Sequence, residues 1–208
     1  RSMWERGWSF IKKAGTIILL STIFVWFTSR FGWLDGQFCM LEEEQISASI
    51  LAKIGNAIAW IFAPLGWGNW QATVASITGL VAKENIVGTL GVLYSGGAGT
   101  VYDAIAAAFN GITGYSFLVF NLLCAPCFAA IGAIKREMNS PKWTWFAIAY
   151  QCGFAYAVAL MINQFGGLFT GNANIIGVIA AVIVLAAIIY MLVRPYKEAT
   201  KLTTKVEM

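Results

Sequence analysis

The chain has 208 residues, of which 59% are hydrophobic and only 12% are charged, and its formal net charge is +4. Soluble domains carry about 25% charged residues, so this composition excludes an ordinary soluble domain and indicates a membrane protein. The basic residues mark the ends of apolar segments and form no single patch, so we do not expect nucleic-acid binding. The sequence contains no histidine, which excludes a histidine-ligated metal site within the chain.

Residues 8–30 are the first apolar segment, and about 20 such residues are enough to cross a bilayer. Lys12 and Lys13 lie near its start. Because basic residues collect on the cytoplasmic side of membrane proteins, they predict a cytoplasmic N-terminus. Residues 31–45 are polar and acidic, and we expect them to form a loop on the opposite side.

Residues 46–63 have the spacing of an amphipathic helix, which we expect to be interfacial or packed in the bundle. Lys53 and Asn56 lie on the polar face, and the segment Pro64-Leu65-Gly66-Trp67-Gly68 ends the helix. The apolar face consists of five isoleucines, Ile46, Ile50, Ile54, Ile58 and Ile61.

Residues 70–94 form an apolar segment with charges in its middle, at Lys83 and Glu84, and glycines on both sides. A charged group at membrane depth costs about 2.5–3.5 kcal/mol, so the pair needs partners or water. The pattern predicts two short helical halves that meet at a polar break, as at the binding sites of transporters. The alternative is that Lys83 and Glu84 end a helix at the membrane surface, with the lysine reaching water.

The remaining segments complete a predicted all-α, polytopic transmembrane bundle with broken or re-entrant helices. Residues 95–113 are glycine-rich and are expected at the surface, and the basic ends of the apolar segments would all face the cytoplasm. This requires that residues 46–113 either cross an even number of times or dip in and out, and the charge pattern does not choose. The predicted spans are 8–30, 70–94 (broken), 114–134, 143–165 and 174–193.

Two thiols, Cys124 and Cys127, flank Pro126 inside the span 114–134. Proline removes a backbone donor and frees the carbonyl four residues earlier, here that of Leu122. A membrane tolerates such a break only where protein, water or an ion satisfies the freed group, and sulfur at this position suits a passing transition-metal ion. Two alternatives are that both cysteines are small buried apolar residues, and that C-x-x-C forms a redox pair. Cys152 on the next span is a weaker third sulfur.

Three motifs resemble the C-terminal membrane half of the ferrous iron transport protein B (FeoB) family. They are PLGWGNWQATV at 64–74, TGLVAKENIVGTL at 78–90 and APCFAAIGAIKRE at 125–137. The resemblance implies that residues 1–208 are the second of two related gate repeats, a type that nucleoside-recognition proteins also contain.

The resemblance also assigns roles to individual residues. The family's proline–cysteine motif falls on Pro126 and Cys127, and its lysine–glutamate motif falls on Lys83 and Glu84. The family cysteine is thought to contact iron during passage. Relatives often carry another residue at the position of Cys124, so its candidacy rests on its thiol alone. The predicted metal-contacting residues are Cys127, Glu84 and Cys124, and the predicted gating or structural residues are Lys83, Pro126 and Glu137.

As a member of this family, the chain would be part of a Fe²⁺ transporter in the bacterial cytoplasmic (inner) membrane, with both termini cytoplasmic. Its partners would be the bilayer and the rest of the transporter, including a GTP-binding domain that uses GTP and Mg²⁺. A homo-oligomer is also compatible with the sequence. The chain has no G-x-x-x-x-G-K-[ST] motif, so we expect no GTP binding, no enzymatic activity and no cofactor within it.

Three other functions remain open at this point. The chain could transport another divalent metal or a nucleoside, or it could be a membrane scaffold without a path. It could also be a thiol-redox enzyme, which would form a reversible Cys124–Cys127 disulfide.

Overall fold

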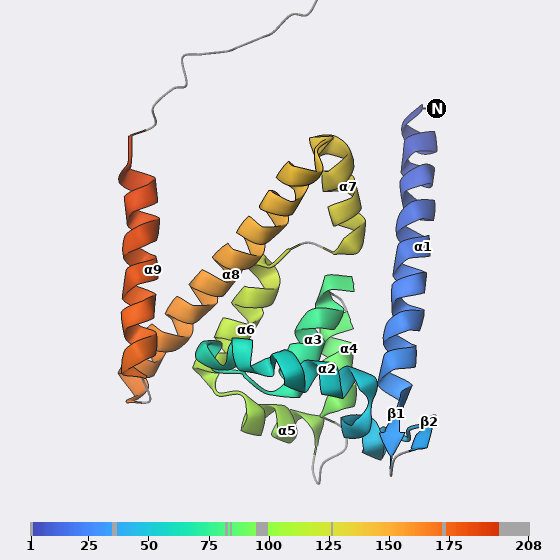
Figure 1. Ribbon diagram of the computed structural model, residues 1–208, viewed down its shortest axis with the longest axis horizontal. Helices are drawn as coiled ribbons and strands as arrows, with labels where there is room; N and C mark the ends of the chain where they lie inside the picture. The colour runs from blue at the N-terminus through green and yellow to red at the C-terminus, as the bar shows by residue number, and fades with distance from the viewer. Residues whose placement is uncertain are drawn as a thin grey trace, which may run out of the picture.

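The computed structural model describes residues 2–34, 37–81, 83, 85–94, 100–125, 127–171 and 174–195. Figure 1 shows α1 and α9 on two opposite sides of the molecule, with the shorter helices between them. The elements in chain order are α1 (Ser2–Arg30), β1 (Phe31–Leu34), β2 (Gln37–Met40), η1 (Glu43–Ala48), α2 (Ile50–Ala59), η2 (Trp60–Leu65), α3 (Trp70–Val81), α4 (Asn85–Leu93), α5 (Val101–Ala108), α6 (Gly111–Leu123), α7 (Phe128–Met138), α8 (Pro141–Thr170) and α9 (Ile175–Val193).

The long helices α1, α8 and α9 run between two distinct ends of the molecule (Figure 1). The start of α1, the junction of α7 with α8 and the end of α9 lie at one end, and the strands, α5 and the α8–α9 turn lie at the other (Figure 1). Lys135 and Arg136 occupy the last turn of α7, and Arg194 caps the end of α9. Basic residues therefore gather at the end where the described chain starts and stops.

Several helices have the length that a membrane requires. Within the described residues, α8 and α9 are each long and apolar enough to cross. Two helix pairs, Ile50–Leu65 with Trp70–Leu80 and Val101–Ala108 with Gly111–Leu123, pass the same test together but bend by 97° and 94°. With 29 residues, α1 extends about 44 Å. The predicted polytopic helical class with broken helices is confirmed, with one small sheet added.

That sheet lies where the sequence predicts a loop. β1 and β2 form an antiparallel hairpin in which Phe31 pairs with Met40 and Leu34 pairs with Gln37. The rings of Trp33 and Phe38 lie on facing strands with their centroids 5.4 Å apart. Cross-strand aromatic pairs stabilise short hairpins, and the polar composition of the segment conceals this signal.

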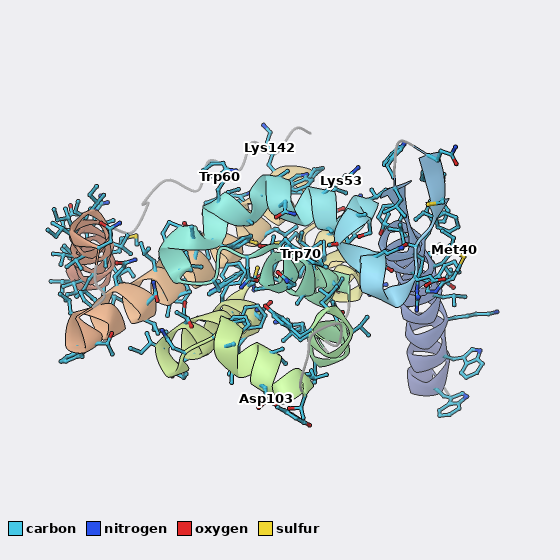
Figure 2. All side chains as sticks on the ribbon, turned by 90° about the horizontal axis from the view of Figure 1, so that it is seen from below. Met40, Lys53, Trp60, Trp70, Asp103 and Lys142 are labelled. Atoms are coloured by element: carbon cyan, nitrogen blue, oxygen red, sulfur yellow. The ribbon has the colours of Figure 1, made fainter. Side chains whose placement is uncertain are left out.

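The helix expected over 46–63 is divided into η1, α2 and η2, and the isoleucines of its predicted apolar face differ in burial, with Ile46 only 8% exposed. Ile54 is 46% exposed and Ile61 is 38% exposed. Small residues face the bundle because α3 approaches closely. A Cβ on Gly55 would lie 2.7 Å from Cγ2 of Val74. Figure 2 shows Lys53 and Trp60 on the outer side of this layer. The buried residues of α2 are Leu51, Ala52, Gly55 and Ala59.

The segment 70–94 is a helical hairpin that turns back on itself. At its base, the hydroxyl of Tyr94 lies 3.3 Å from Oδ1 of Asn69. Nearer the tip, Oγ1 of Thr78 lies 3.2 Å from Oγ1 of Thr89. The chain therefore leaves α4 at the end where it entered α3. Residues 70–94 therefore do not make a single crossing in one direction.

The segment 114–134 is two helices, because α6 ends at Leu123 and α7 begins at Phe128. Local signals account for the neighbouring boundaries. Asn110 accepts hydrogen bonds from the first turn of α6 in a capping box, and Asn139 ends α7 in the left-handed conformation. Pro141 occupies the first turn of α8, where its missing N–H leaves no bond unmade.

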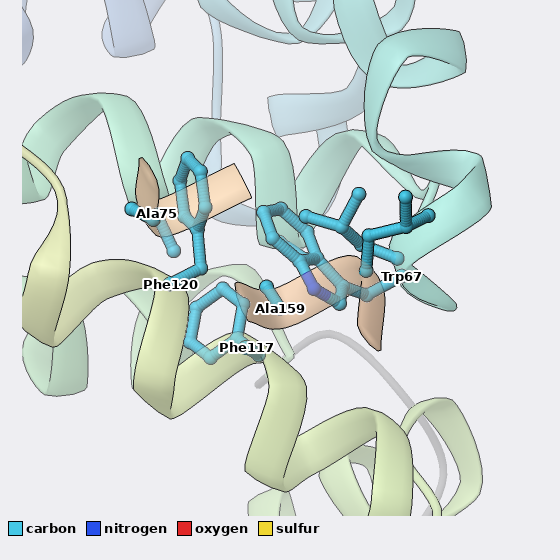
Figure 3. Close-up of a cluster of buried hydrophobic side chains, with 9 residues drawn as sticks. Trp67, Ala75, Phe117, Phe120 and Ala159 are labelled. Atoms are coloured by element: carbon cyan, nitrogen blue, oxygen red, sulfur yellow. The ribbon is translucent and has the colours of Figure 1, made fainter. Parts of the chain in front are cut away.

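The core of the molecule is an aromatic cluster centred on Trp67, which is 1% exposed (Figure 3). Its ring lies 4.5 Å from that of Phe62, 5.1 Å from that of Phe117 and 5.3 Å from that of Phe120. Alanines at 75 and 159 complete the cluster from α3 and α8. The cluster joins η2, α3, α6 and α8 and so positions the helices that carry the polar groups described below.

We expect Gly66→Ala to destabilise the full-length protein, because Gly66 has a φ of +91° and no room for a side chain. Its Cβ would lie 2.6 Å from Cγ2 of Thr113 and 2.8 Å from Cγ of Asn163. Backbone strain alone costs about 1–3 kcal/mol. Gly171→Ala is the matched control, since Gly171 has a φ of +75° with open space around it. Thermal unfolding in detergent should show a larger loss for Gly66→Ala, and equal losses would contradict the close packing.

Candidate functional site

Two interruptions of the helices meet, at about the same level in Figure 1. One is the tip of the α3–α4 hairpin, which carries Lys83, and the other is the gap between α6 and α7. The ammonium nitrogen Nζ of Lys83 donates a hydrogen bond to the backbone carbonyl of Leu122 over 3.0 Å. A side chain at one interruption thus supplies a donor to the backbone at the other.

The carbonyl of Leu122 needs this donor for two reasons that are visible in the sequence. The last four carbonyls of an α-helix have no partner within the helix, and α6 ends one residue later. In addition, the residue four positions on is Pro126, which has no N–H to donate. The neighbouring carbonyl of Phe120 accepts from the N–H of Cys124 at 2.8 Å. The Leu122 carbonyl instead accepts from Lys83.

The cysteines flank the gap between α6 and α7, and each belongs to a helix end. Cys124 caps the C-terminus of α6, and its Sγ lies 3.7 Å from Sγ of Cys152 on α8. Cys127 occupies the N-cap of α7 and is half-buried, and its carbonyl accepts from the N–H of Ile131 at 3.0 Å. The thiol in contact with Cys124 therefore comes from a different helix and not from the C-x-x-C motif.

Neutral polar groups continue from the interruptions into the packed interior. Asn121 is 9% exposed, and its amide donates to the carbonyl of Phe117 at 2.9 Å. Oγ of Ser76 and Oε1 of Gln151 are buried and have no hydrogen-bond partner among the described residues. This part of the bundle thus contains oxygen atoms whose hydrogen-bonding capacity is not used by the part of the chain that the structure describes.

The other predicted site residues are distributed as follows. Glu84 and Pro126 lie outside the described residues. Glu137 is exposed near the end of α7, beside Lys135 and Arg136, at the basic end of the molecule. Among the described residues, no group of three or more histidine, cysteine, aspartate or glutamate side chains could hold a metal ion together. The structure therefore brings Lys83 to the α6–α7 gap and leaves Glu137 away from it.

A cavity of about 720 Å³ lies where η2, the start of α6 and the α8–α9 turn come together. Asn110, Asn163 and Gln164 line it, together with Thr113 and Tyr156. These residues were not selected from the sequence. Two adjacent amides inside the apolar segment 143–165 nevertheless indicate a polar site within the bundle. A span of lipid-facing residues would not normally carry them.

The amides have a structural task that explains part of their presence. Nε2 of Gln164 and Nδ2 of Asn163 both donate to the carbonyl of Pro64, at 2.7 Å and 3.1 Å. The hydroxyl of Tyr156 donates to the carbonyl of Ile61 at 2.7 Å. These carbonyls belong to η2, where a 3₁₀ turn and a proline interrupt the regular backbone hydrogen bonds. Side chains of α8 therefore satisfy the irregular backbone of η2.

These features define an α-helical membrane protein in which a re-entrant hairpin packs against a broken helix. The chain belongs to the Gate family, described as nucleoside recognition, whose sequence model matches residues 11–141.

The chain is also similar to several iron transporters. It is 39% identical over 170 residues to the Fe(2+) transporter FeoB of Methanocaldococcus jannaschii, which covers 81% of this chain and 25% of that protein. It is 34% identical over 169 residues to the Fe(2+) transporter FeoB of Staphylococcus aureus, covering 81% of this chain and 24% of that protein. For the Fe(2+) transporter FeoB of Campylobacter jejuni the identity is 33% over 169 residues, with coverages of 76% and 27%.

The chain thus spans about a quarter of the length of these relatives. No solved structure matches it. The resemblance to the FeoB family is confirmed.

Proposed function

We propose that this chain is part of the membrane domain of a ferrous-iron transporter, and that the meeting point of its two helix interruptions lines part of the ion's path. The observation that carries the proposal is the hydrogen bond from Lys83 to the Leu122 carbonyl. It marks a place where backbone polar groups and a charge occur between apolar helices, at a position that is exposed in the isolated chain. Such places are retained in membrane proteins where a solute or ion is handled.

The chemistry of the gap suits a transient Fe²⁺ contact. Fe²⁺ accepts thiolate, carboxylate, carbonyl and water ligands. Cys127 begins α7 on one side of the gap, and the terminal carbonyls of α6 lie on the other side. Glu84, the next residue after Lys83 in the sequence, would add a carboxylate. One thiolate with oxygen ligands lets the ion leave, whereas a complete thiolate cage would retain it.

The surroundings of this path follow from the family resemblance and from the charges. We assign the basic end of the molecule, with the start of α1 and the end of α9, to the cytoplasmic side of the inner membrane (Figure 1). The partners would be the remaining part of the transporter and its GTP-binding domain, whose movements would open the path. Copies of the same protein could assemble around it.

Cys127→Ser in the full-length protein tests the proposal. Loss of a contacting sulfur should lower Fe²⁺ uptake about tenfold or more, because even an outer-shell change at a metal site reduces affinity by about 10–100-fold. The measurement is uptake of radiolabelled iron by cells at matched expression. Cys39→Ser is the control, since Cys39 lies in β2 at the far end of the molecule. Unchanged uptake in Cys127→Ser would remove this residue from the path.

A nucleoside is the second candidate substrate. The family is described as nucleoside recognition, and the cavity at the α8–α9 turn has amide groups that can pair with the edges of a base. Competition of iron uptake by manganese, zinc and nucleosides separates the candidates. If only the metals inhibit iron uptake, the result supports iron transport. If the protein transports nucleosides and takes up no iron, nucleoside transport would replace iron transport as the function. A scaffold without a path predicts that Cys127→Ser alters assembly and leaves uptake unchanged.

A further inference from the structure

We propose that Cys124 and Cys152 form a two-thiolate binding site for a thiophilic divalent cation such as Zn²⁺ or Cd²⁺. This site differs from the path contact at Cys127, because its sulfur atoms join the C-terminus of α6 to the middle of α8. Neither the family resemblance nor the C-x-x-C spacing points to this pair.

The distance between the sulfur atoms fits a metal better than a disulfide. Cys124 Sγ and Cys152 Sγ are 3.7 Å apart. Two sulfurs bound to one tetrahedral ion with bonds of about 2.3 Å lie roughly 3.75 Å apart. A disulfide bond is about 2.05 Å long, so the same atoms would have to approach by roughly 1.7 Å. The pair therefore has the sulfur separation of a tetrahedral site before any ion binds.

The charge balance suits an apolar setting. Both cysteines are only half-buried in the isolated chain, but they lie on helices whose outer faces are apolar. Binding breaks two S–H bonds, forms two metal–sulfur bonds and releases two protons to water. The neutral pair of thiols becomes a neutral metal dithiolate with no change of oxidation state. The ammonium of Lys83 donates a hydrogen bond to the carbonyl of Leu122, two residues before Cys124. Its positive charge does not oppose a metal complex that has no net charge.

Two positions of a tetrahedral ion remain after the two sulfurs, and water can fill them. With two sulfurs from the protein, the ion would exchange, and soft thiolate ligands favour Zn²⁺ over Mn²⁺ or Mg²⁺.

A bound ion would join α6 to α8 at the residue that begins the α6–α7 gap. If the gap lines the iron path, as we propose above, the ion would inhibit uptake by holding the gap in one conformation. This consequence rests on the proposed function, but the binding itself does not.

The test is titration of the detergent-solubilised full-length protein with Cd²⁺, followed by the ultraviolet absorbance of cadmium–thiolate bonds. We expect Cys124→Ser and Cys152→Ser each to weaken one Cd²⁺-binding event at least about tenfold, more than an outer-shell change does. Cys39→Ser should leave that event unchanged. Titrations that are identical in the wild-type protein and both variants would overturn the site.

A second measurement on the wild-type protein keeps the result independent of variant folding. Cd²⁺ should protect Cys124 and Cys152 together from alkylation, read by mass spectrometry, while Cys39 stays reactive. Protection of neither residue, or a Cys124–Cys152 disulfide in the untreated protein, would overturn the proposal. If binding is observed but the protein does not take up iron, the proposed function fails and the site stands.

Discussion

Replacing Lys83 with methionine should lower Fe²⁺ uptake by the full-length protein about tenfold or more. Methionine keeps most of the length of the side chain but has no donor, so the carbonyl of Leu122 loses its partner. An unsatisfied polar group away from water costs about 1–3 kcal/mol, and 1.4 kcal/mol changes a conformational equilibrium tenfold. The hairpin tip and the end of α6 would then no longer be held together, and the proposed path would rearrange.

Lys83→Arg is the matched variant, because it keeps both the charge and the donors. We expect it to retain most of the uptake when the two proteins are expressed equally. The structural effect can be followed separately, by crosslinking cysteines placed at the hairpin tip and at the end of α6. Normal uptake in Lys83→Met would show that this hydrogen bond has no part in transport.

Trp67→Ala should destabilise the full-length protein by about 3–5 kcal/mol, the usual loss when a large aromatic residue is removed from a packed core. Trp67 is 1% exposed, and its ring contacts aromatic residues of both η2 and α6 (Figure 3). Between membrane helices most of this energy comes from packing, so the cavity left behind accounts for the loss. Thermal unfolding in detergent, followed by size-exclusion chromatography, measures it.

Trp67→Phe separates packing from hydrogen bonding. Nε1 of Trp67 is buried without a partner among the described residues, so phenylalanine removes no hydrogen bond and keeps part of the ring volume. We therefore expect a smaller loss than for alanine. Equal losses in the two variants would indicate that the indole nitrogen has a partner in the assembled transporter, and that packing is not the main contribution.

Much of the helical architecture could be predicted, because its signals are local. Composition indicated the membrane, and apolar length predicted α8 and α9. A proline between two cysteines predicted the gap after α6. The hairpin β1–β2 was missed because its stability comes from pairs across two strands, whereas the composition of 31–45 is that of a loop. The residues that α2 buries were not identified from the sequence, because the close approach of α3 determines which positions are covered.

The candidate site was predictable in its parts but not in its connections. Lys83 and the freed carbonyl of Leu122 could each be identified from neighbouring residues. Nothing in the sequence paired them, because they are 39 positions apart. Cys124 was matched with Cys127 by spacing, whereas its sulfur contact is Cys152, 28 positions away on another helix. The structural role of the amides at 163 and 164 is not evident from the sequence, because the carbonyl of Pro64 to which both donate lies in a distant segment of the chain.

The amino-acid sequence by itself determined that this is a helical membrane protein, where its helices are interrupted and to which family it is related. Each of these depends on residues that are neighbours along the chain. Only the tertiary structure decided that residues 70–94 turn back, that Lys83 meets the end of α6 and that two distant thiols touch. The reason is physical. Neighbouring residues in the sequence show that a lysine or a carbonyl needs a hydrogen-bond partner. The packing of the helices determines which group becomes that partner.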